Sequence, residues 1–144
     1  MKKNPLFILL TIILSLLFAT SCSIIPGTGS NQLTGTTWKL VSYNGNIPLA
    51  GKDMTASFDA KEIQGSASCN TYFGTYRLKG DQISIGELGW TEMACLDPEG
   101  IMEQEQIIMK LLSESSSYSI QGDRLQITTS AGELLIFQQL IGIE

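Results

Sequence analysis

The residues of this chain that could do chemistry are three cysteines and a group of carboxylates, because the 144-residue sequence contains no histidine. Without histidine, a Cys-His or Ser-His nucleophile and a zinc site with imidazole ligands are excluded. The motifs Gly-x-Ser-x-Gly, the phosphate-binding P-loop and Gly-x-Gly-x-x-Gly are also absent from the sequence. A Ser-Lys pair is the nucleophile arrangement that the composition leaves formally open.

The carboxylates of interest gather in one part of the chain. They are Glu87, Glu92, Asp97, Glu99, Glu103 and Glu105. Calcium binding would need the alternating Asp-x-Asp-x-Asp-Gly spacing of a preformed loop, which this stretch lacks. Glycoside hydrolysis would need a pair of carboxylates on either side of the scissile bond, and nothing in the spacing selects a pair. We interpret these acids as a solvated face, and we predict no catalytic, cofactor-binding or metal-binding residues.

The N-terminus predicts an export signal that ends at a lipid attachment site. Lys2 and Lys3 precede an apolar run from Leu6 to Ala19, which is shorter than the roughly 20 residues of a membrane-spanning helix. Ala19-Thr20-Ser21-Cys22 resembles a bacterial lipobox, with alanine where leucine is commoner. We therefore predict a lipoprotein signal peptide over residues 1–21 and lipidation of Cys22. The alternatives are an ordinary secretory signal with an incidental cysteine, and an uncleaved membrane anchor.

Residues 22–32 predict a lipidated flexible tether, because Gly, Ser, Thr and Pro dominate the segment. Ser23 follows the lipidated cysteine where aspartate would signal inner-membrane retention in Gram-negative bacteria. By that analogy we expect the outer membrane, with the protein facing the periplasm.

The charge balance narrows the class of partner. Removing Lys2 and Lys3 with the signal leaves seven basic residues against 14 acidic ones, a net charge of −7. That sign disfavours nucleic acid and electrostatic adhesion to anionic lipid. The expected partners are the membrane, through the lipid anchor, and an envelope protein or cell-wall component.

Lipidation of Cys22 leaves Cys69 and Cys95 as a pair in an exported, oxidising compartment. We favour a structural disulfide, which would close a loop of about 26 residues and stabilise the fold by about 3.5 kcal/mol on the chain-entropy model. The alternatives are two buried free thiols and a redox pair. A redox pair is disfavoured because close spacing and a charged neighbour that lowers a thiol pKa are not evident.

Alternating apolar residues and tight turns predict mostly antiparallel strands. We expect strands at residues 36–43, 54–58, 62–68 and 133–138, and two hairpins at residues 75–85 and 117–127. The two hairpins resemble each other and share a Gly-Asp turn, at Gly80-Asp81 and Gly122-Asp123. A duplication would explain the likeness, but convergence on one turn type is slightly favoured because two units do not establish a repeat.

One helix is predicted between the two hairpins, with Asp97 as its N-cap and Pro98 at its first position. The apolar face comprises Ile101, Ile108, Leu111 and Leu112, with Met102 and Met109 beside it, and Glu103, Gln106 and Lys110 lie opposite. Glu105 falls within the apolar arc, and we interpret it as a glutamate at the margin of a short helix rather than as a functional carboxylate. The predicted fold class is α+β: a curved, mostly antiparallel sheet or small barrel of about seven or eight strands with one covering helix.

The stretch Gly65-Ser66-Ala67-Ser68-Cys69-Asn70 ends one predicted strand and starts a sharp corner. Asn70 directly follows the first cysteine of the pair. Asparagine tolerates left-handed backbone and bonds nearby backbone groups, so we expect it to stabilise this corner. The alternative is that its amide faces a partner.

Two signatures then carry a resemblance to a known family. Ile63 to Tyr76 resembles the glycine-then-Cys-Asn signature of the META domain, and Thr91-Glu92-Met93-Ala94-Cys95 resembles its Thr-x-Met-x-Cys signature. The resemblance covers roughly residues 33–140, and Ser68 stands where many members have glycine. The family includes HslJ-like bacterial lipoproteins. Membership implies a small mixed domain with one helix and an envelope role linked to stress, motility or drug tolerance, and it offers no catalytic residues to carry over.

Three functions are consistent with these observations. The first is a non-enzymatic, membrane-anchored envelope lipoprotein that binds another envelope component in a stress-related role. The second is a holdase-like protein that protects exported proteins, and the third is a cell-wall hydrolase. One compact exposed apolar patch favours the first, scattered apolar exposure favours the second, and a cleft with converging carboxylates favours the third.

Overall fold

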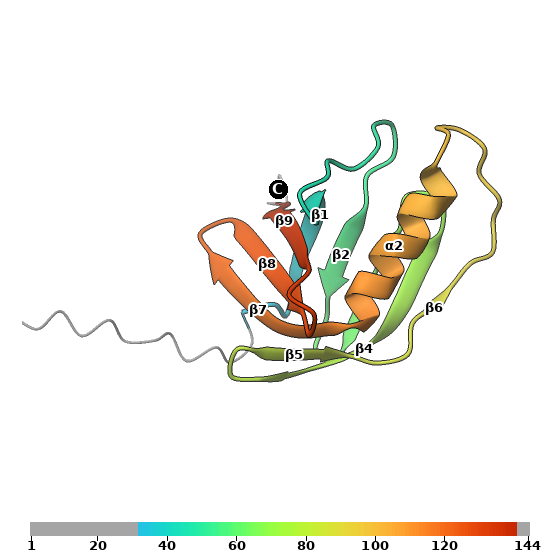
Figure 1. Ribbon diagram of the computed structural model, residues 1–144. Coiled ribbons are helices and arrows are strands. Elements are labelled where there is room, and N and C mark those ends of the chain that lie inside the picture. Colours follow the sequence, from blue (N-terminus) through green and yellow to red (C-terminus); the bar gives the residue numbers. More distant parts are fainter. Residues whose placement is uncertain (1–31, 141–144) are drawn as a thin grey trace, which may run out of the picture.

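The computed structural model describes residues 32–140. Buried and exposed side chains alternate along its strands, and the strands form a closed antiparallel ring (Figure 1). The elements are β1 (Thr36–Tyr43), β2 (Thr55–Phe58), β3 (Glu62–Ser66), β4 (Thr71–Lys79), β5 (Gln82–Ile85), β6 (Gly89–Trp90), α2 (Ile101–Ser113), β7 (Ser115–Gln121), β8 (Arg124–Thr129) and β9 (Leu134–Gln139). Among these residues, no helix has both the length and the hydrophobicity needed to span a bilayer.

The ring follows the order β3-β2-β1-β9-β8-β7-β5-β4 and closes through pairing of β3 with β4. Eight strands therefore form the barrel, and β6 lies outside the ring, where it pairs with β4. The α+β prediction of a small barrel with a single covering helix is confirmed. The seam between β5 and β7 is the weakest part of the ring, because their ladder consists of the Gln82–Ser117 pair.

The core lies inside this ring and follows the period of two that strands impose. Trp38 is 1% exposed, and Leu125, Leu135 and Phe137 are fully buried. Burying each such side chain contributes about 1.5–3 kcal/mol. The helix packs beside the strands of the ring (Figure 1). Its buried side chains belong to the same apolar cluster as those of the strands.

Both predicted hairpins are present, as β4–β5 and β7–β8. Gly80 has φ 64° between Lys79 and Gln82, which pair with each other, and Gly122 has φ 61° between Gln121 and Arg124. These φ values are left-handed, which glycine adopts without steric cost. The Gly-Asp turn therefore acts in the same way in both hairpins.

The predicted helix begins later than the sequence indicated. Its N-cap is Gly100, with φ 84° and no side-chain cap, so the expectation that Asp97 caps the helix and Pro98 opens it was wrong. A turn comes first, closed by the Ile101 N–H, which donates to the Pro98 carbonyl over 3.1 Å. The predicted faces are correct. Met102 is half-buried and the other expected apolar residues are buried, whereas Glu103, Gln106 and Lys110 are exposed.

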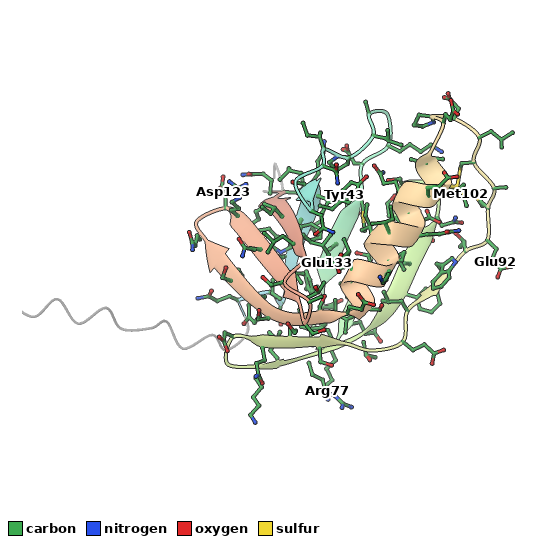
Figure 2. All side chains as sticks on the ribbon, in the orientation of Figure 1. Tyr43, Arg77, Glu92, Met102, Asp123 and Glu133 are labelled. Atoms are coloured by element: carbon green, nitrogen blue, oxygen red, sulfur yellow. A yellow bond between two sulfur atoms is a disulfide. The ribbon has the colours of Figure 1, made fainter. Side chains whose placement is uncertain are left out.

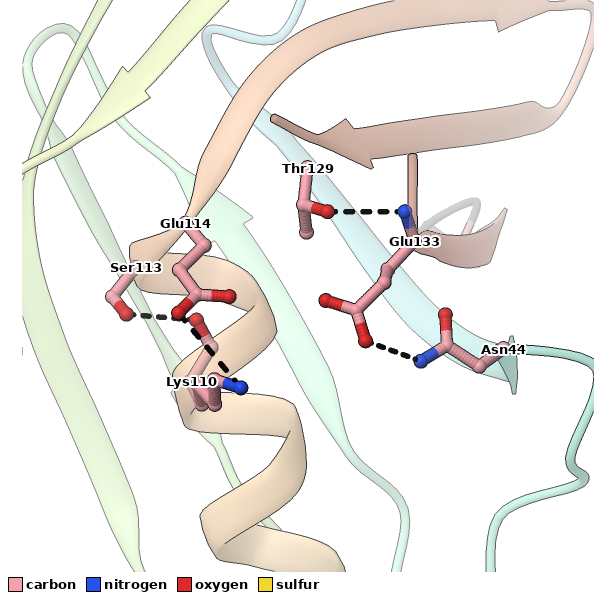
Figure 3. Close-up of polar contacts among 6 residues, drawn as sticks. All are labelled: Asn44, Lys110, Ser113, Glu114, Thr129 and Glu133. Atoms are coloured by element: carbon pink, nitrogen blue, oxygen red, sulfur yellow. Dashed lines mark hydrogen bonds and ion pairs between the residues drawn. The ribbon is translucent and has the colours of Figure 1, made fainter. Parts of the chain in front are cut away.

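Figure 3 shows two polar contacts at the end of the helix and at the turns next to β1 and β9. At the end of the helix, Lys110 pairs with Glu114 over 3.9 Å. Between the neighbouring strands β1 and β9, the Asn44 amide donates to Glu133 over 3.1 Å, and its oxygen accepts from the Leu134 N–H over 2.8 Å. The second contact ties the turn after β1 to the turn before β9.

Candidate functional site

The site begins at the corner where β3 passes into β4. Ser68 takes a left-handed conformation with φ 88°, and the Ala67 N–H donates to the Asn70 carbonyl over 2.6 Å. Asn70 itself does not have a positive φ, so the left-handed residue of this corner is Ser68. The hydrogen bond that closes the corner ends at Asn70, and the strained residue, Ser68, lies two positions earlier.

β2 packs closely against this corner, which explains why residue 65 is glycine. A Cβ atom on Gly65 would lie 1.9 Å from the Thr55 carbonyl oxygen, which is too close for any side chain. The same oxygen accepts a hydrogen bond from the Tyr72 hydroxyl over 2.9 Å. Burial raises the pKa of the Tyr72 hydroxyl, so the phenol stays protonated as this donor.

The Asn70 side chain is 2% exposed and makes hydrogen bonds in three directions. Its oxygen accepts from the Thr91 hydroxyl and from the Met93 N–H, each over 2.7 Å. Its amide nitrogen donates to the Met93 carbonyl over 3.2 Å and to Glu105 over 2.7 Å. Asn70 therefore holds the Thr-x-Met-x-Cys stretch and the helix against the corner, which agrees with the expected structural role of this residue.

Glu105 is the partner that sequence reasoning missed. It is 5% exposed, and both carboxylate oxygens accept from Asn70: one from the backbone N–H over 2.8 Å and the other from the side-chain amide. The interpretation of Glu105 as a marginal residue was wrong, because the apolar arc of the helix packs directly over the corner. Its place within that arc was the signal available in the sequence.

Gln104, next to Glu105, is a second buried polar residue of the helix and is 3% exposed. Its side-chain oxygen accepts from the Leu49 N–H over 2.6 Å, and its nitrogen donates to the Ser68 hydroxyl over 3.4 Å. The first half of α2 therefore anchors two loops at once through adjacent polar side chains.

Cys69 and Cys95 form a disulfide with their Cα atoms 6.0 Å apart, which is the pairing the sequence analysis favoured. Cys69 is 6% exposed inside the corner, and Cys95 lies in the segment between β6 and α2. The bridge and the Asn70 hydrogen bonds thus hold the same segment at neighbouring points.

A groove opens between this segment and the helix, and we call it the β6–α2 groove. One wall is β6 with residues 91–94, and the other is α2 (Figure 1); Figure 2 shows Glu92 on the first wall and Met102 on the second. The volume is about 770 Å³. The lining comprises Asn70, Glu87, Leu88, Trp90, Thr91, Glu92, Met93, Ala94, Met102, Glu105, Gln106, Met109, Lys110 and Ser113.

The groove presents apolar surface to solvent. Trp90 is 52% exposed and Met93 is 54% exposed, whereas Leu88 and Met109 are almost buried beneath them. Trp90 pairs with Tyr72 across the ladder, so its ring lies on the same face of the sheet as the buried tyrosine and therefore on the helix side. Aromatic and methionine side chains of this kind are typical of binding surfaces.

The acidic residues of the sequence mostly face water, as expected. Glu87 and Glu92 are exposed at the rim of the groove, Asp97, Glu99 and Glu103 are exposed beyond it, and Glu105 is the buried exception. Within residues 32–140, no group of three or more His, Cys, Asp or Glu side chains is placed to hold a metal ion.

Fold and site together define a small antiparallel barrel with one helix, in which a disulfide and a buried Asn-Glu pair fix the segment before that helix. The chain belongs to the META domain family, whose model matches residues 31–140.

Solved structures with this fold are similar to the chain. An NMR structure of a protein from Burkholderia xenovorans is 25% identical, with a TM-score of 0.63 over 76% of this chain and 85% of that one. A second NMR structure is 26% identical, with a TM-score of 0.61 over 74% of this chain and 91% of that one. The crystal structure of a DUF4847 family protein from Bacteroides vulgatus ATCC 8482, at 14% identity, TM-score 0.55 and coverage of 74% and 94%, shows likeness of fold alone. No curated protein matched.

The predicted signal peptide, Cys22 and nearly all of the predicted tether lie outside the described residues. Lipidation of Cys22, the envelope location and the domain bounds 1–21 and 22–32 therefore stay predictions.

Proposed function

We propose that this META domain protein is a non-enzymatic, lipid-anchored component of the bacterial cell envelope, whose β6–α2 groove binds another envelope component in a stress-related role. The observation that carries the proposal is the groove itself, where Trp90 and Met93 expose about half of their surface in one concavity. Solvent-exposed aromatic surface of this kind is typical of interaction sites.

The carboxylates near the groove favour binding over catalysis. Both oxygens of Glu105 are engaged by Asn70, so this buried acid is fixed as an acceptor for the corner. Glu87 and Glu92 are exposed to solvent at the rim of the groove, outside any hydrophobic enclosure of the kind that surrounds a catalytic acid. A hydrolase is therefore less well supported than a binding protein.

The distribution of exposed apolar side chains bears on the holdase alternative. Other exposed apolar side chains, among them Ile47, Phe73, Leu96 and Ile107, do not line the groove, and some exposed apolar side chains are ordinary for a folded surface. Trp90 and Met93 differ because they continue into the buried Leu88 and Met109. One continuous apolar surface supports a defined partner over general affinity for unfolded chains.

Site-specific photo-crosslinking in intact cells tests the groove. A photoreactive residue at Glu92 on the rim should give a discrete adduct with an envelope component, and one at Ser119, exposed on the outside of β7, should not. Trp90→Ala should remove the adduct at position 92. Equal, heterogeneous adducts at both positions would favour the holdase, and no adduct at position 92 would contradict groove binding.

Fatty-acid labelling tests the anchor separately. Cys22→Ala should abolish lipid labelling and release or mislocalise the protein, because the thiol is the attachment point. Ser21→Ala keeps a small residue before the cysteine and should retain the label. Unchanged labelling of Cys22→Ala would refute the anchor without bearing on the groove.

A further inference from the structure

β6 is an edge strand that borders the groove. It pairs with β4 through Tyr72–Trp90 and Phe73–Gly89, and within residues 32–140 no strand pairs with its other edge. β5 and β6 both pair with β4. The next strand of the ring, β7, pairs with β5 at Gln82 and does not pair with β6. The helix α2 lies beside β6 (Figure 1), and residues of both elements line the groove.

The ladder with β4 fixes the direction of the backbone groups of β6. The Thr91 N–H donates to the Thr71 carbonyl over 3.1 Å, so the peptide groups of Thr91 and Gly89 face β4. Peptide groups alternate in direction along an antiparallel strand. The N–H and C=O of Trp90 therefore point away from β4, on the edge that borders the groove.

An unpaired strand edge beside a helix is suited to an extended chain. Such a chain can pair its backbone with the edge, and its alternate side chains can enter the apolar groove. The groove offers both kinds of contact. Trp90 supplies the free backbone groups and an exposed ring, and Met93 and Met109 supply adaptable apolar surface on either wall. A helical ligand would leave the edge of β6 unpaired.

The charge of the groove rim indicates which charge a ligand should carry. Glu87 and Glu92 line the groove and are exposed, and Lys110, the cation of the lining, already pairs with Glu114 over 3.9 Å. The rim thus offers carboxylates to an incoming chain. Complementary basic side chains would be attracted, and acidic ones would be repelled.

We infer that the groove binds an extended peptide segment of another envelope protein, with alternating apolar residues and flanking lysine or arginine, by strand addition to β6. This inference rests on the proposed function, because it names the ligand of the same groove. Backbone pairing supplies register, the apolar groove accepts alternate side chains, and the rim selects basic residues.

Peptide titration of the full mature chain tests the inference. The probe is a nine-residue peptide that alternates valine with lysine, and its control has the same sequence with N-methylated backbone amides on the pairing edge. The probe should bind, slow amide hydrogen exchange at Trp90, and lose affinity at least about tenfold on N-methylation, because about 1.4 kcal/mol of lost hydrogen bonding is a factor of ten.

Charge reversal supplies the matched variants. Glu87→Lys with Glu92→Lys should weaken the valine-lysine peptide by about tenfold and favour a valine-glutamate peptide instead. Glu99→Lys with Glu103→Lys makes the same two changes at exposed positions outside the groove lining and should leave both affinities unchanged. All four sites are exposed, so the fold should tolerate these substitutions.

The outcomes separate the inference from the proposed function. Equal binding of the N-methylated peptide, or no peptide binding while crosslinking at position 92 still succeeds, overturns strand addition and leaves groove binding intact. Failure of both the peptides and the crosslink overturns both. Peptide binding that requires removal of residues 22–31 assigns the groove to the chain's own tether and also overturns the inference.

Discussion

Two asparagine-glutamate pairs in this barrel have nearly the same local chemistry. In each, the asparagine amide donates to the glutamate, and the asparagine oxygen accepts a backbone N–H: that of Met93 for Asn70, and that of Leu134 for Asn44. Asn70 and its glutamate are at most 5% exposed, whereas the contact of Asn44 lies in solvent (Figure 3).

The comparison shows that surroundings, rather than the bond itself, decide what such a pair does. At the rim, water can replace Glu133 as the partner of Asn44, so the pair adds little. Inside the corner, both side chains are at most 5% exposed, so a lost partner leaves a buried donor or a buried carboxylate unsatisfied. The buried pair therefore fixes the floor and one wall of the groove, whereas the exposed pair only links two turns at the surface.

Asn70→Ala should produce the largest difference between the two regions. It removes four side-chain hydrogen bonds and leaves Glu105 without its amide partner, so we expect a loss of about 3–5 kcal/mol, as for other broken buried charge contacts. Glu133→Ala at the rim should cost no more than about 0.5 kcal/mol. Urea denaturation measures both. A loss below about 1 kcal/mol for Asn70→Ala would mean that water enters the corner.

Breaking the disulfide should have the next largest effect. Cys69→Ser, or reduction, should lower the free energy of unfolding by about 3.5 kcal/mol on the chain-entropy model. Hydrogen exchange should speed up mainly at residues 91–100, because the bridge fixes that segment, and much less in β8 and β9. Non-reducing peptide mass spectrometry should find Cys69 and Cys95 linked.

The control for this experiment is the double variant Cys69→Ser with Cys95→Ser, whose stability should not respond to reductant. Free thiols on separate peptides of the purified protein would show that the bridge does not form, and the corner would then depend on Asn70 and packing alone.

Glu105→Gln sharpens the comparison with a smaller change. The new NH₂ group would face one of the two Asn70 donors, so one buried donor loses its acceptor and the protein should lose about 1–3 kcal/mol. Glu133→Gln, the matched change at the rim, should be neutral within about 0.5 kcal/mol. Equal effects at both sites would contradict the conclusion that burial gives the Asn70 contact its weight.

The smallest effect is expected at Ser68, whose φ of 88° costs a non-glycine residue about 1–2 kcal/mol. Ser68→Gly relieves that strain, but glycine loses more backbone entropy on folding, which costs about 0.5–1 kcal/mol of stability. Ser68→Ala keeps the strain and loses the hydroxyl that Gln104 contacts. We expect the glycine variant to be more stable than the alanine variant by about 1 kcal/mol in paired urea melts. The reverse order would mean that the corner is not strained.

The sequence by itself determined the features that depend on neighbours along the chain. The two Gly-Asp hairpins, the inward residues of the strands and the buried face of α2 follow from periods of 2.0 and 3.6 residues and from glycine at turns. The disulfide was accessible for a different reason: assigning Cys22 to the lipid leaves Cys69 and Cys95 as a pair.

Tertiary structure decided everything that depends on segments far apart in the chain. Glu105 looked marginal because its partner, Asn70, lies 35 residues away, and the helix starts at Ile101 because the preceding turn closes on Pro98 rather than on a side-chain cap. The two-residue strand β6 leaves no periodic signal, since it is defined by pairing with β4. The groove exists because that strand and the helix leave a space between them, and a local pattern of residues cannot encode such a distance.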